Sequence, residues 1–233
     1  LLQYRPLLAY TPDDVTNLRH AAKAVDGGVD YVNLCVDATA LATVADSFAA
    51  LELRVDRERR CGWPEMLRLL DTDWAGPEGE RLRLLMQSSP RFGAGGTAAD
   101  SWATRVSSLF TRLVSRRTPD GWLMIPGIFS WALVITMGRE LGATPNGRHA
   151  GDPISHGANP HPGFRHDGAA TALAAAVASV QPSMGNTAPL QMDIDPMLIK
   201  GADGPEIVAS LIRTHFDLGG TQINLNVVDA KKV

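Results

Sequence analysis

The sequence predicts an α/β fold in which helices alternate with strands along most of the chain. Segments with helical periodicity are separated by short β-branched and aromatic runs, and no internal repeat or low-complexity linker divides them. With 233 residues, 45% of them hydrophobic and 20% charged, the chain is long enough to form one sizeable core. We therefore expect residues 1–233 to form a single domain, or one part of a larger one.

The first part of the chain is predicted to contain a helix, a strand and a second helix. Thr11 is a suitable N-cap before Pro12 and two acidic residues, so a helix is expected from there to about Val25. Tyr31–Val36 is β-branched and aromatic and predicts a strand. An amphipathic helix is expected over Leu41–Val55. Its predicted apolar face consists of Leu41, Val44, Ala45, Phe48, Leu51 and Val55.

The middle of the chain is predicted to be mostly helical. Two short helices are expected over Pro64–Trp74 and Glu80–Met86, before a glycine-rich turn. The clearest helical periodicity covers Ala98–Val114. Its predicted apolar positions are Ala99, Trp102, Ala103, Val106, Leu109, Phe110 and Leu113. A buried strand is expected over Trp122–Ile128, whereas the periodicity of Trp131–Met137 fits a helix and a strand equally.

The segment Gly142–Gly168 holds six glycines, four prolines and four of the six histidines of the chain. Regular helix or strand does not survive this density of glycine and proline. Long irregular segments inside compact domains are uncommon and are usually functional or disordered. We therefore interpret the segment as a folded loop that lines a site.

After this loop the sequence predicts two helices and two strands in alternation. The helices are expected over Ala169–Val180, with Asp167 as N-cap, and over Pro205–Phe216. The strands are expected over Leu190–Ile194 and Thr221–Val228. The last strand alternates between two faces: Ile223, Leu225 and Val227 on one, Gln222, Asn224 and Asn226 on the other. This alternation fits a barrel with a wet lumen and a sheet with one solvated face equally well.

Composition excludes several classes of function. A net charge of −3 gives no electrostatic case for binding nucleic acid. The longest apolar run is interrupted by Pro126 and Gly127 and is too short to span a membrane, and no signal peptide is visible. Cys35 and Cys61 form neither a metal-binding spacing nor a disulfide framework, which fits a reducing cytoplasm. We expect Cys35 to be a small core residue and Cys61 a surface residue at a helix start.

The histidines are the candidates for a metal site. Their spacing matches no zinc pattern, and the prolines between them disfavour two ligands on one helical face. We therefore predict hydrogen bonds to loop backbone for these side chains, and no metal. They are His149, His156, His161 and His166. His215 lies beside the apolar face of its helix and is expected to be a buried, hydrogen-bonded histidine.

Several motifs occur in the order found in one known family. Ala143–Pro153 resembles its TPDGR-x-AG loop, with Asn146 in place of the usual Asp, and Gly157–Pro160 continues the match. Gly168–Ala172 resembles the next helix start of that family. Further similar segments are Gly27–Tyr31, Thr43–Leu51, Ser89–Gly93 and Gly219–Val228. Together these segments resemble the glycyl radical enzymes, the pyruvate formate-lyase-like family.

The resemblance implies part of a ten-stranded α/β barrel, in which a stored glycyl radical takes hydrogen from a cysteine and the thiyl radical then takes hydrogen from a small substrate. A separate S-adenosylmethionine radical enzyme would install the radical, and the full-length protein would be a homodimer. The reaction would break a C–C, C–O or C–N bond. The family cysteine lies upstream of the strand entry and the radical glycine beyond the last strand, so neither Cys35 nor any other residue here is assigned as catalytic. Substrate-pocket or loop candidates are Asn146, Gly147, Arg148, Asn159, Asn224 and Asn226.

Three alternatives remain open at this point. Gly157–Pro160 favours formate C-acetyltransferase proper, whereas Asn186–Gln191 does not resemble that enzyme closely. A non-catalytic barrel remnant or structural subunit, and a metal-dependent enzyme that uses the histidine loop, are the other two. The absence of an initial Met and a helix-like start cut short near Val233 lead us to expect a fragment truncated at both ends, inactive alone.

Overall fold

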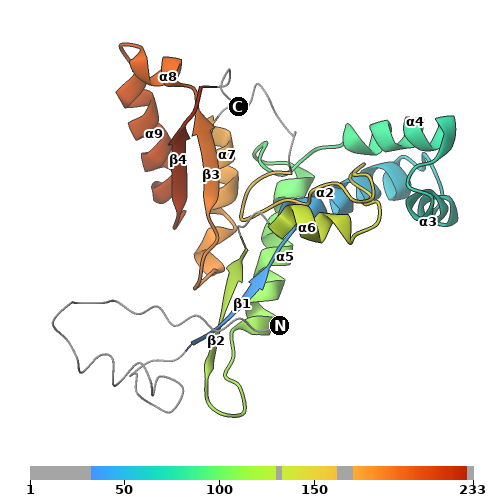
Figure 1. Cartoon of the computed structure of the whole chain (residues 1–233), viewed down its shortest axis with the longest axis horizontal. Helices are drawn as coiled ribbons and strands as arrows, with labels where there is room; N and C mark the ends of the chain where they lie inside the picture. The colour runs from blue at the N-terminus through green and yellow to red at the C-terminus, as the bar shows by residue number, and fades with distance from the viewer. Residues whose placement is uncertain (1–32, 130–132, 162–169, 230–233) are drawn as a thin grey trace.

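The computed structural model describes residues 33–129, 133–161 and 170–229 (Figure 1). The strands are β1 (Asn33–Ala38), β2 (Leu123–Ile128), β3 (Leu190–Ile194) and β4 (Ile223–Val227). The helices are α2 (Leu41–Ala50), η2 (Leu51–Arg57), α3 (Trp63–Asp71), α4 (Gly76–Gln87), α5 (Ala98–Val114), α6 (Leu133–Arg139), α7 (Ala170–Ala178), η3 (Gln181–Ser183), α8 (Pro196–Lys200) and α9 (Gly204–Asp217). The helix expected over Thr11–Val25, the Asp167 cap and His166 lie outside the described residues.

The strands form two parallel pairs. β1 pairs with β2, so that Cys35 lies opposite Ile125 and Asp37 opposite Gly127. β3 pairs with β4 in the same way, with Gln191 opposite Asn224. Parallel neighbours need a crossover connection, which α2 to α5 supply for the first pair and α8 and α9 for the second. The predicted α/β class is confirmed.

The two strand pairs meet where the chain approaches β3. The Asn186 N–H donates to the Pro126 carbonyl at 3.0 Å, and the Ile128 N–H donates to the Thr187 carbonyl at 2.7 Å. These bonds set the start of β3 beside the end of β2, as Figure 1 shows. The two strand pairs are separate two-stranded sheets, linked at this corner by the backbone bonds of Asn186 and Thr187.

The main core lies between the strands and the helices that cover one of their faces. Leu190, Met192 and Ile194 of β3 are buried, and Ile223 and Leu225 of β4 pack on the same cluster. Helices α7 and α9 contribute buried residues to it, as do α2 and α5. The apolar side of the predicted alternation in the last strand thus faces the core, except that Val227 is exposed.

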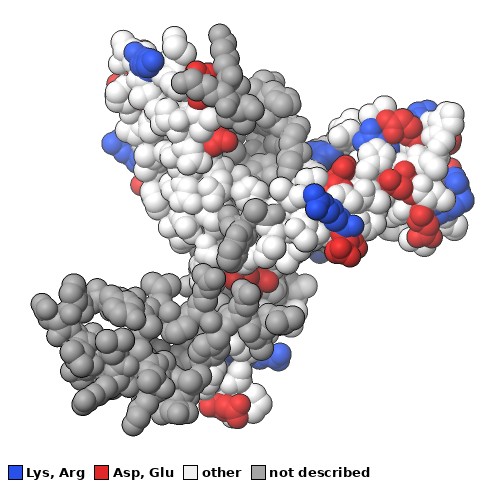
Figure 2. Space-filling model, viewed as in Figure 1, with Lys and Arg blue, Asp and Glu red and all other residues white. Residues whose placement is uncertain are grey.

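A second, smaller cluster holds η2, α3 and α4 together. At its centre Trp74 is 2% exposed, and Met66, Leu69 and Leu82 are fully buried beside it. Cys61 belongs to this cluster, so its prediction as a surface residue is wrong. Acidic and basic side chains gather over α3 and α4, whereas the surface over β3, β4 and α9 in the same view is mostly uncharged (Figure 2).

Helix α5 has the predicted bounds. Most of its predicted apolar face is confirmed, because Ala99 and Ala103 are buried and Trp102, Val106 and Phe110 pack on the main core. Thr97 caps it, and the Asp100 carboxylate accepts from the Thr97 backbone N–H at 2.8 Å, which completes a capping box. The small residues Ala99, Ala103 and Ser107 are buried, while Leu109 and Leu113 are 46% and 59% exposed. The small side chains allow α2 to pack closely on this helix.

The predicted apolar face that begins in α2 is confirmed at Leu41, Ala45 and Val55, which are buried. The alanines of α2 are buried against α5, whereas Val44 and Phe48 from the predicted apolar face are 36% and 42% exposed. Phe48 stacks on Trp102 with 4.7 Å between ring centroids. Beyond Ala50 the predicted helix continues to Arg57 with the wider turns of η2.

Two further expectations are resolved by the structure. Residues 133–139 of the ambiguous segment are helical, as α6. Cys35 is exposed on β1, so its prediction as a core residue is wrong. No helix in the described part of the chain is long and apolar enough to cross a bilayer.

Candidate functional site

The described part of the glycine-rich loop is a series of hydrogen-bonded turns. The Gly147 N–H donates to the Thr144 carbonyl at 3.0 Å and closes a turn around Asn146. Oδ1 of Asn146 accepts from the Thr144 hydroxyl at 2.7 Å and from the Arg148 N–H at 3.3 Å. Its Nδ2 finds no acceptor among the described residues. An aspartate would carry no such donor, and nothing in the structure explains why Asn stands here.

Arg148 holds the loop together from inside. Its side chain is 3% exposed. The guanidinium donates to the Asp152 carbonyl at 2.6 Å, to the carbonyls of Leu141 and Gly142, and to the Thr144 hydroxyl at 3.2 Å. Burial lowers the pKa of Arg148, although an arginine stays charged under these conditions. Its donors are used within the protein, so this residue organises the loop.

Position 147 requires glycine, both because of its backbone conformation and because a side chain would not fit there. Its φ is +87°, which L residues with a Cβ rarely adopt. A Cβ at this position would lie 2.9 Å from the Arg83 carbonyl oxygen. The Gly147 carbonyl in turn accepts from the Arg83 guanidinium at 3.1 Å. The loop is thereby fixed against α4.

A buried ion pair anchors the same turn to α2. Asp46 is 2% exposed and lies 3.2 Å from the Arg91 guanidinium, which also donates to the Asn146 carbonyl at 2.7 Å. The Phe92 N–H donates to Asp46 at 2.8 Å, and the Asn146 N–H donates to the Ser47 hydroxyl at 3.2 Å. Burial raises the pKa of Asp46 to about 6, although Arg91 and the Phe92 N–H oppose that change.

This pKa makes a pH-dependent contribution to stability. Because the folded-state pKa of about 6 lies above the reference value of 3.8, the folded protein holds the proton more tightly than the unfolded chain. The contribution of Asp46 to stability therefore decreases as pH rises from about 4 to about 6. The unfolding free energy of Asp46→Asn minus that of the wild type is expected to increase by about 2–3 kcal/mol from pH 4 to pH 7. Urea denaturation of both proteins at several pH values measures it, and a pH-independent difference would contradict it.

The described histidines of the loop belong to no group of potential metal ligands. Nδ1 of His149 lies 3.1 Å from the Asp73 carboxylate. The partner of this ring nitrogen is therefore a side chain, whereas a backbone group was predicted. Burial lowers the pKa of His156. No group of three or more potential metal ligands occurs among the described residues. His215 is fully buried, and its Nδ1 lies 2.9 Å from the Ala174 carbonyl, which confirms the expected burial and one hydrogen bond. Its Nε2 has no hydrogen-bond partner among the described residues.

Asn159 completes the edge of β3 with its side chain. Its Nδ2 donates to the Gln191 carbonyl at 2.7 Å, and its Oδ1 accepts from the Gln191 N–H at 2.8 Å. The carboxamide therefore pairs with the strand as a neighbouring peptide group would. Next to it, the Ala158 N–H donates to the Pro189 carbonyl at 3.0 Å. Asn159 thus links the loop to the sheet.

Asn159→Ala removes both bonds to the Gln191 backbone. It is expected to lower the unfolding free energy by about 2–4 kcal/mol, because a partly buried donor and acceptor lose their partners. Urea denaturation followed by circular dichroism measures this loss. Asn224→Ala on the adjacent strand is the matched control, with an expected loss below about 1 kcal/mol. Equal losses in the two variants would contradict a specific role for Asn159.

Asn224 and Asn226 lie on the face of β4 turned away from the core. Asn224 is half-buried and Asn226 is exposed. Asn226 donates to the Asp193 carboxylate on β3 at 3.1 Å. The alternation predicted from the sequence therefore produces a polar face on the β3–β4 pair. Of the six candidates, only these two project from this face, while the other four act within the loop or bind the edge of β3.

Neither cysteine is prepared as a thiolate nucleophile. Desolvation by the surrounding chain and then the Asp37 carboxylate raise the pKa of Cys35. Desolvation and then Glu65 raise the pKa of Cys61. A thiolate needs a positive environment. Both residues are therefore thiols at neutral pH.

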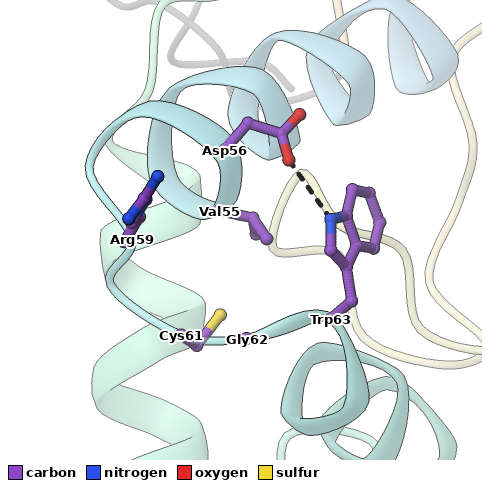
Figure 3. A pocket seen from close by; sticks show the side chains of 6 residues that line it. All are labelled: Val55, Asp56, Arg59, Cys61, Gly62 and Trp63. Atoms are coloured by element: carbon purple, nitrogen blue, oxygen red, sulfur yellow. Dashed lines mark hydrogen bonds between the residues drawn. The ribbon is translucent and has the colours of Figure 1, made fainter.

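A shallow pocket of about 450 Å³ lies on the α3–α4 side of the molecule (Figure 3). The Trp63 indole N–H donates to Asp56 at 3.2 Å across it. Its lining residues are Val55, Asp56, Arg59, Cys61, Gly62 and Trp63. None of the six candidates lines this pocket, so it does not unite them into a site.

Comparison with known proteins identifies related enzymes. The family described as pyruvate formate lyase-like matches residues 2–138. Trans-4-hydroxy-L-proline dehydratase of Clostridioides difficile is 25% identical over 204 residues, which cover 87% of this chain and 26% of the relative. (2S)-3-sulfopropanediol dehydratase of Klebsiella oxytoca is 27% identical over 212 residues, which cover 88% of this chain and 25% of the relative.

Solved structures agree with these sequences. One solved protein structure concerns 1,2-propanediol dehydration in Roseburia inulinivorans. It superposes on this chain with a TM-score of 0.83 and 28% sequence identity, over 90% of this chain and 27% of that chain. The B12-independent glycerol dehydratase of Clostridium butyricum gives 0.82 at 28% identity, over 89% and 26%. The chain therefore spans about a quarter of the length of its relatives and has part of their barrel fold. It belongs to the pyruvate formate lyase-like family of glycyl radical enzymes.

Proposed function

We propose that this chain builds part of the barrel wall of a glycyl radical lyase or dehydratase, as a single partial domain. The observation that carries the proposal is the polar face on the parallel β3–β4 pair, opposite a face buried by helices. Parallel sheets are normally covered on both sides. A polar, open face in such a sheet is suited to line a chamber that holds a small hydroxylated substrate.

The residues of this chain would line that chamber and exclude water from it. Helices α7 and α9 seal one side of β3 and β4, and the loop bonds of Arg148 and Asn159 fix the strand edge. Asn224 and Asn226 would offer hydrogen bonds to substrate. Bond cleavage itself would use a stored glycyl radical and a thiyl radical from residues that the family resemblance places outside this chain. The dry chamber would protect these radicals from water.

A radical lyase or dehydratase also implies partners. We propose a radical S-adenosylmethionine activating enzyme, a homodimeric full-length protein and a small-molecule substrate. The free thiols of Cys35 and Cys61 fit a reducing compartment, for which we propose the cytoplasm. The related dehydratases named above support cleavage of a C–O bond over acyl transfer.

Electron paramagnetic resonance tests the proposed function. The full-length protein that contains this chain is expected to give a glycyl radical doublet after anaerobic treatment with its activating enzyme. The isolated chain of residues 1–233 is expected to give none. A doublet from the isolated chain would refute our assignment of the radical glycine outside it. The lack of a doublet in the full-length protein would favour a non-catalytic barrel remnant.

A further inference from the structure

The pocket in Figure 3 lies where the chain leaves η2 and turns back toward α3. η2 has the wide turns of a π-helix, a form that is rare and is frequent at functional sites. Arg59 follows it with a φ of +54°, in the left-handed region that residues with a Cβ seldom adopt. Such strain is common at ligand-binding sites. Two backbone irregularities therefore border a pocket of about 450 Å³, a volume typical of small-molecule sites.

Arg59 lines this pocket with an unpaired guanidinium group. Its side chain has no carboxylate partner and no hydrogen bond among the residues that the structure describes. The neighbouring arginines are all paired with glutamates: Arg54 and Arg60 with Glu58, at 2.9 Å each, and Arg57 with Glu52. In this arginine-rich segment the cation beside the pocket is thus the one left available to an anionic group.

Asp56 is the acidic group of the same pocket. Its Oδ1 accepts from the Trp63 indole N–H at 3.2 Å, whereas its Oδ2 has no donor within the described ranges. Asp56 and Arg59 are three residues apart, a spacing at which opposite charges can pair on a helix. They form no ion pair, because η2 ends before Arg59 and the backbone becomes left-handed there. In the view of Figure 3, Arg59 and Trp63 lie at opposite ends of the pocket, with Val55 and Cys61 between them.

The rest of the lining is mainly apolar. Val55 and Cys61 are buried, and Trp63 is 48% exposed, so its indole ring is available for contact. The pocket therefore combines a carboxylate oxygen, a separate guanidinium and an aromatic side wall. A molecule with a single charge satisfies only one of the two charged groups. A small zwitterion with an apolar body satisfies both, since an ammonium group donates to Asp56 and a carboxylate accepts from Arg59.

We propose that this pocket binds a free amino acid with an apolar side chain. Asp56 holds the ammonium group, Arg59 holds the carboxylate, and Trp63 and Val55 contact the side chain of the ligand. These four residues belong to one continuous segment, whose position is fixed by the small core cluster around Trp74. The proposal does not rest on the proposed function, because its residues belong neither to the β3–β4 pair nor to the glycine-rich loop.

Three probes of similar shape test the two charges separately: L-leucine, L-leucinol, which lacks the carboxylate, and 4-methylpentanoate, which lacks the ammonium group. Isothermal titration calorimetry with the full-length protein is expected to show at least about fivefold tighter binding of leucine than of either analogue. Asp56→Asn should abolish the preference over 4-methylpentanoate and retain the preference over leucinol. Arg59→Gln should do the reverse.

Arg57→Gln is the matched control, because it removes a neighbouring guanidinium that pairs with Glu52 and does not line the pocket. It should leave the three affinities unchanged, and circular dichroism confirms that each variant is folded. No binding of leucine at millimolar concentration, equal binding of the three probes, or preferences that survive both pocket substitutions would overturn the proposal. An effect of Arg57→Gln as large as that of Arg59→Gln would also overturn it.

Discussion

Replacing Arg148 with alanine is expected to lower the free energy of unfolding by about 3–5 kcal/mol, because three carbonyl groups lose their buried donor at once. A cavity left by the long side chain adds to the loss. Arg148→Lys is expected to recover only part of it, since an ammonium group cannot span the separate acceptors of a planar guanidinium. Urea denaturation monitored by circular dichroism gives all three values.

The control for this prediction is Arg139→Ala. Arg139 is an exposed arginine on α6, close in sequence to the same loop. Its replacement should change the free energy by less than about 0.5 kcal/mol. Limited proteolysis adds a local readout, because the Arg148 variant should be cleaved between Gly142 and His161 at lower protease concentrations than the control. Equal stability of the Arg148 and Arg139 variants would refute the role of Arg148 as the internal support of the loop.

Gly138→Ala is expected to destabilise the protein by more than about 3 kcal/mol, although alanine normally stabilises a helix by about 1 kcal/mol relative to glycine. A Cβ at position 138 would lie 2.2 Å from the Asp152 carbonyl oxygen and 3.0 Å from Cα of Pro153. Both contacts are with backbone, so a side-chain rotation cannot relieve them. Helix α6 and the loop would have to separate.

Gly142→Ala is the matched control, because a Cβ there would meet no atom within 4 Å. Its effect should stay within about 0.5 kcal/mol. Thermal unfolding of the two variants under identical conditions compares them directly. A Gly138 variant as stable as the Gly142 variant would show that α6 does not pack against the loop as closely as described.

The sequence predicted helices and strands well wherever capping or turn residues mark their ends. Thr97 and Asp100 form the capping box of α5, and the observed bounds Ala98–Val114 match the expected ones. β3 is also found at the expected bounds, Leu190–Ile194. Helix α8 was missed, although Asp195 before Pro196 is a clear start signal, because the helix has only five residues.

Burial was harder to predict because it depends on the partner helix. Periodicity placed Leu109 of α5 and Phe48 of α2 on buried faces, but both are exposed, whereas Ala103 and Ala45 from the same predicted faces are buried. Likewise, a β-branched run around Cys35 suggested a core strand, whereas Cys35 is exposed. The sequence of one helix or strand does not reveal which side its neighbour occupies.

In the candidate site too, some features could be predicted from the sequence and others could not. Its irregular loop and the alternation around Asn224 were evident from composition and period. The supporting bonds were not, because the acceptors of Arg148 are backbone carbonyls and the partner of Asn159 is the Gln191 backbone. Backbone groups are common to all residues, so no sequence pattern marks them.

The side-chain pairing of Asn159 determines how the sheet can grow. An unpaired strand edge is a template for aggregation, and proteins often block such edges with side chains or loops. At Gln191 the carboxamide already occupies the outer edge of β3, so no further strand can add there. In the described residues the outer edges of β1 and β4 have no such cover. Intermolecular β-sheet formation by this chain should therefore not begin at this edge of β3.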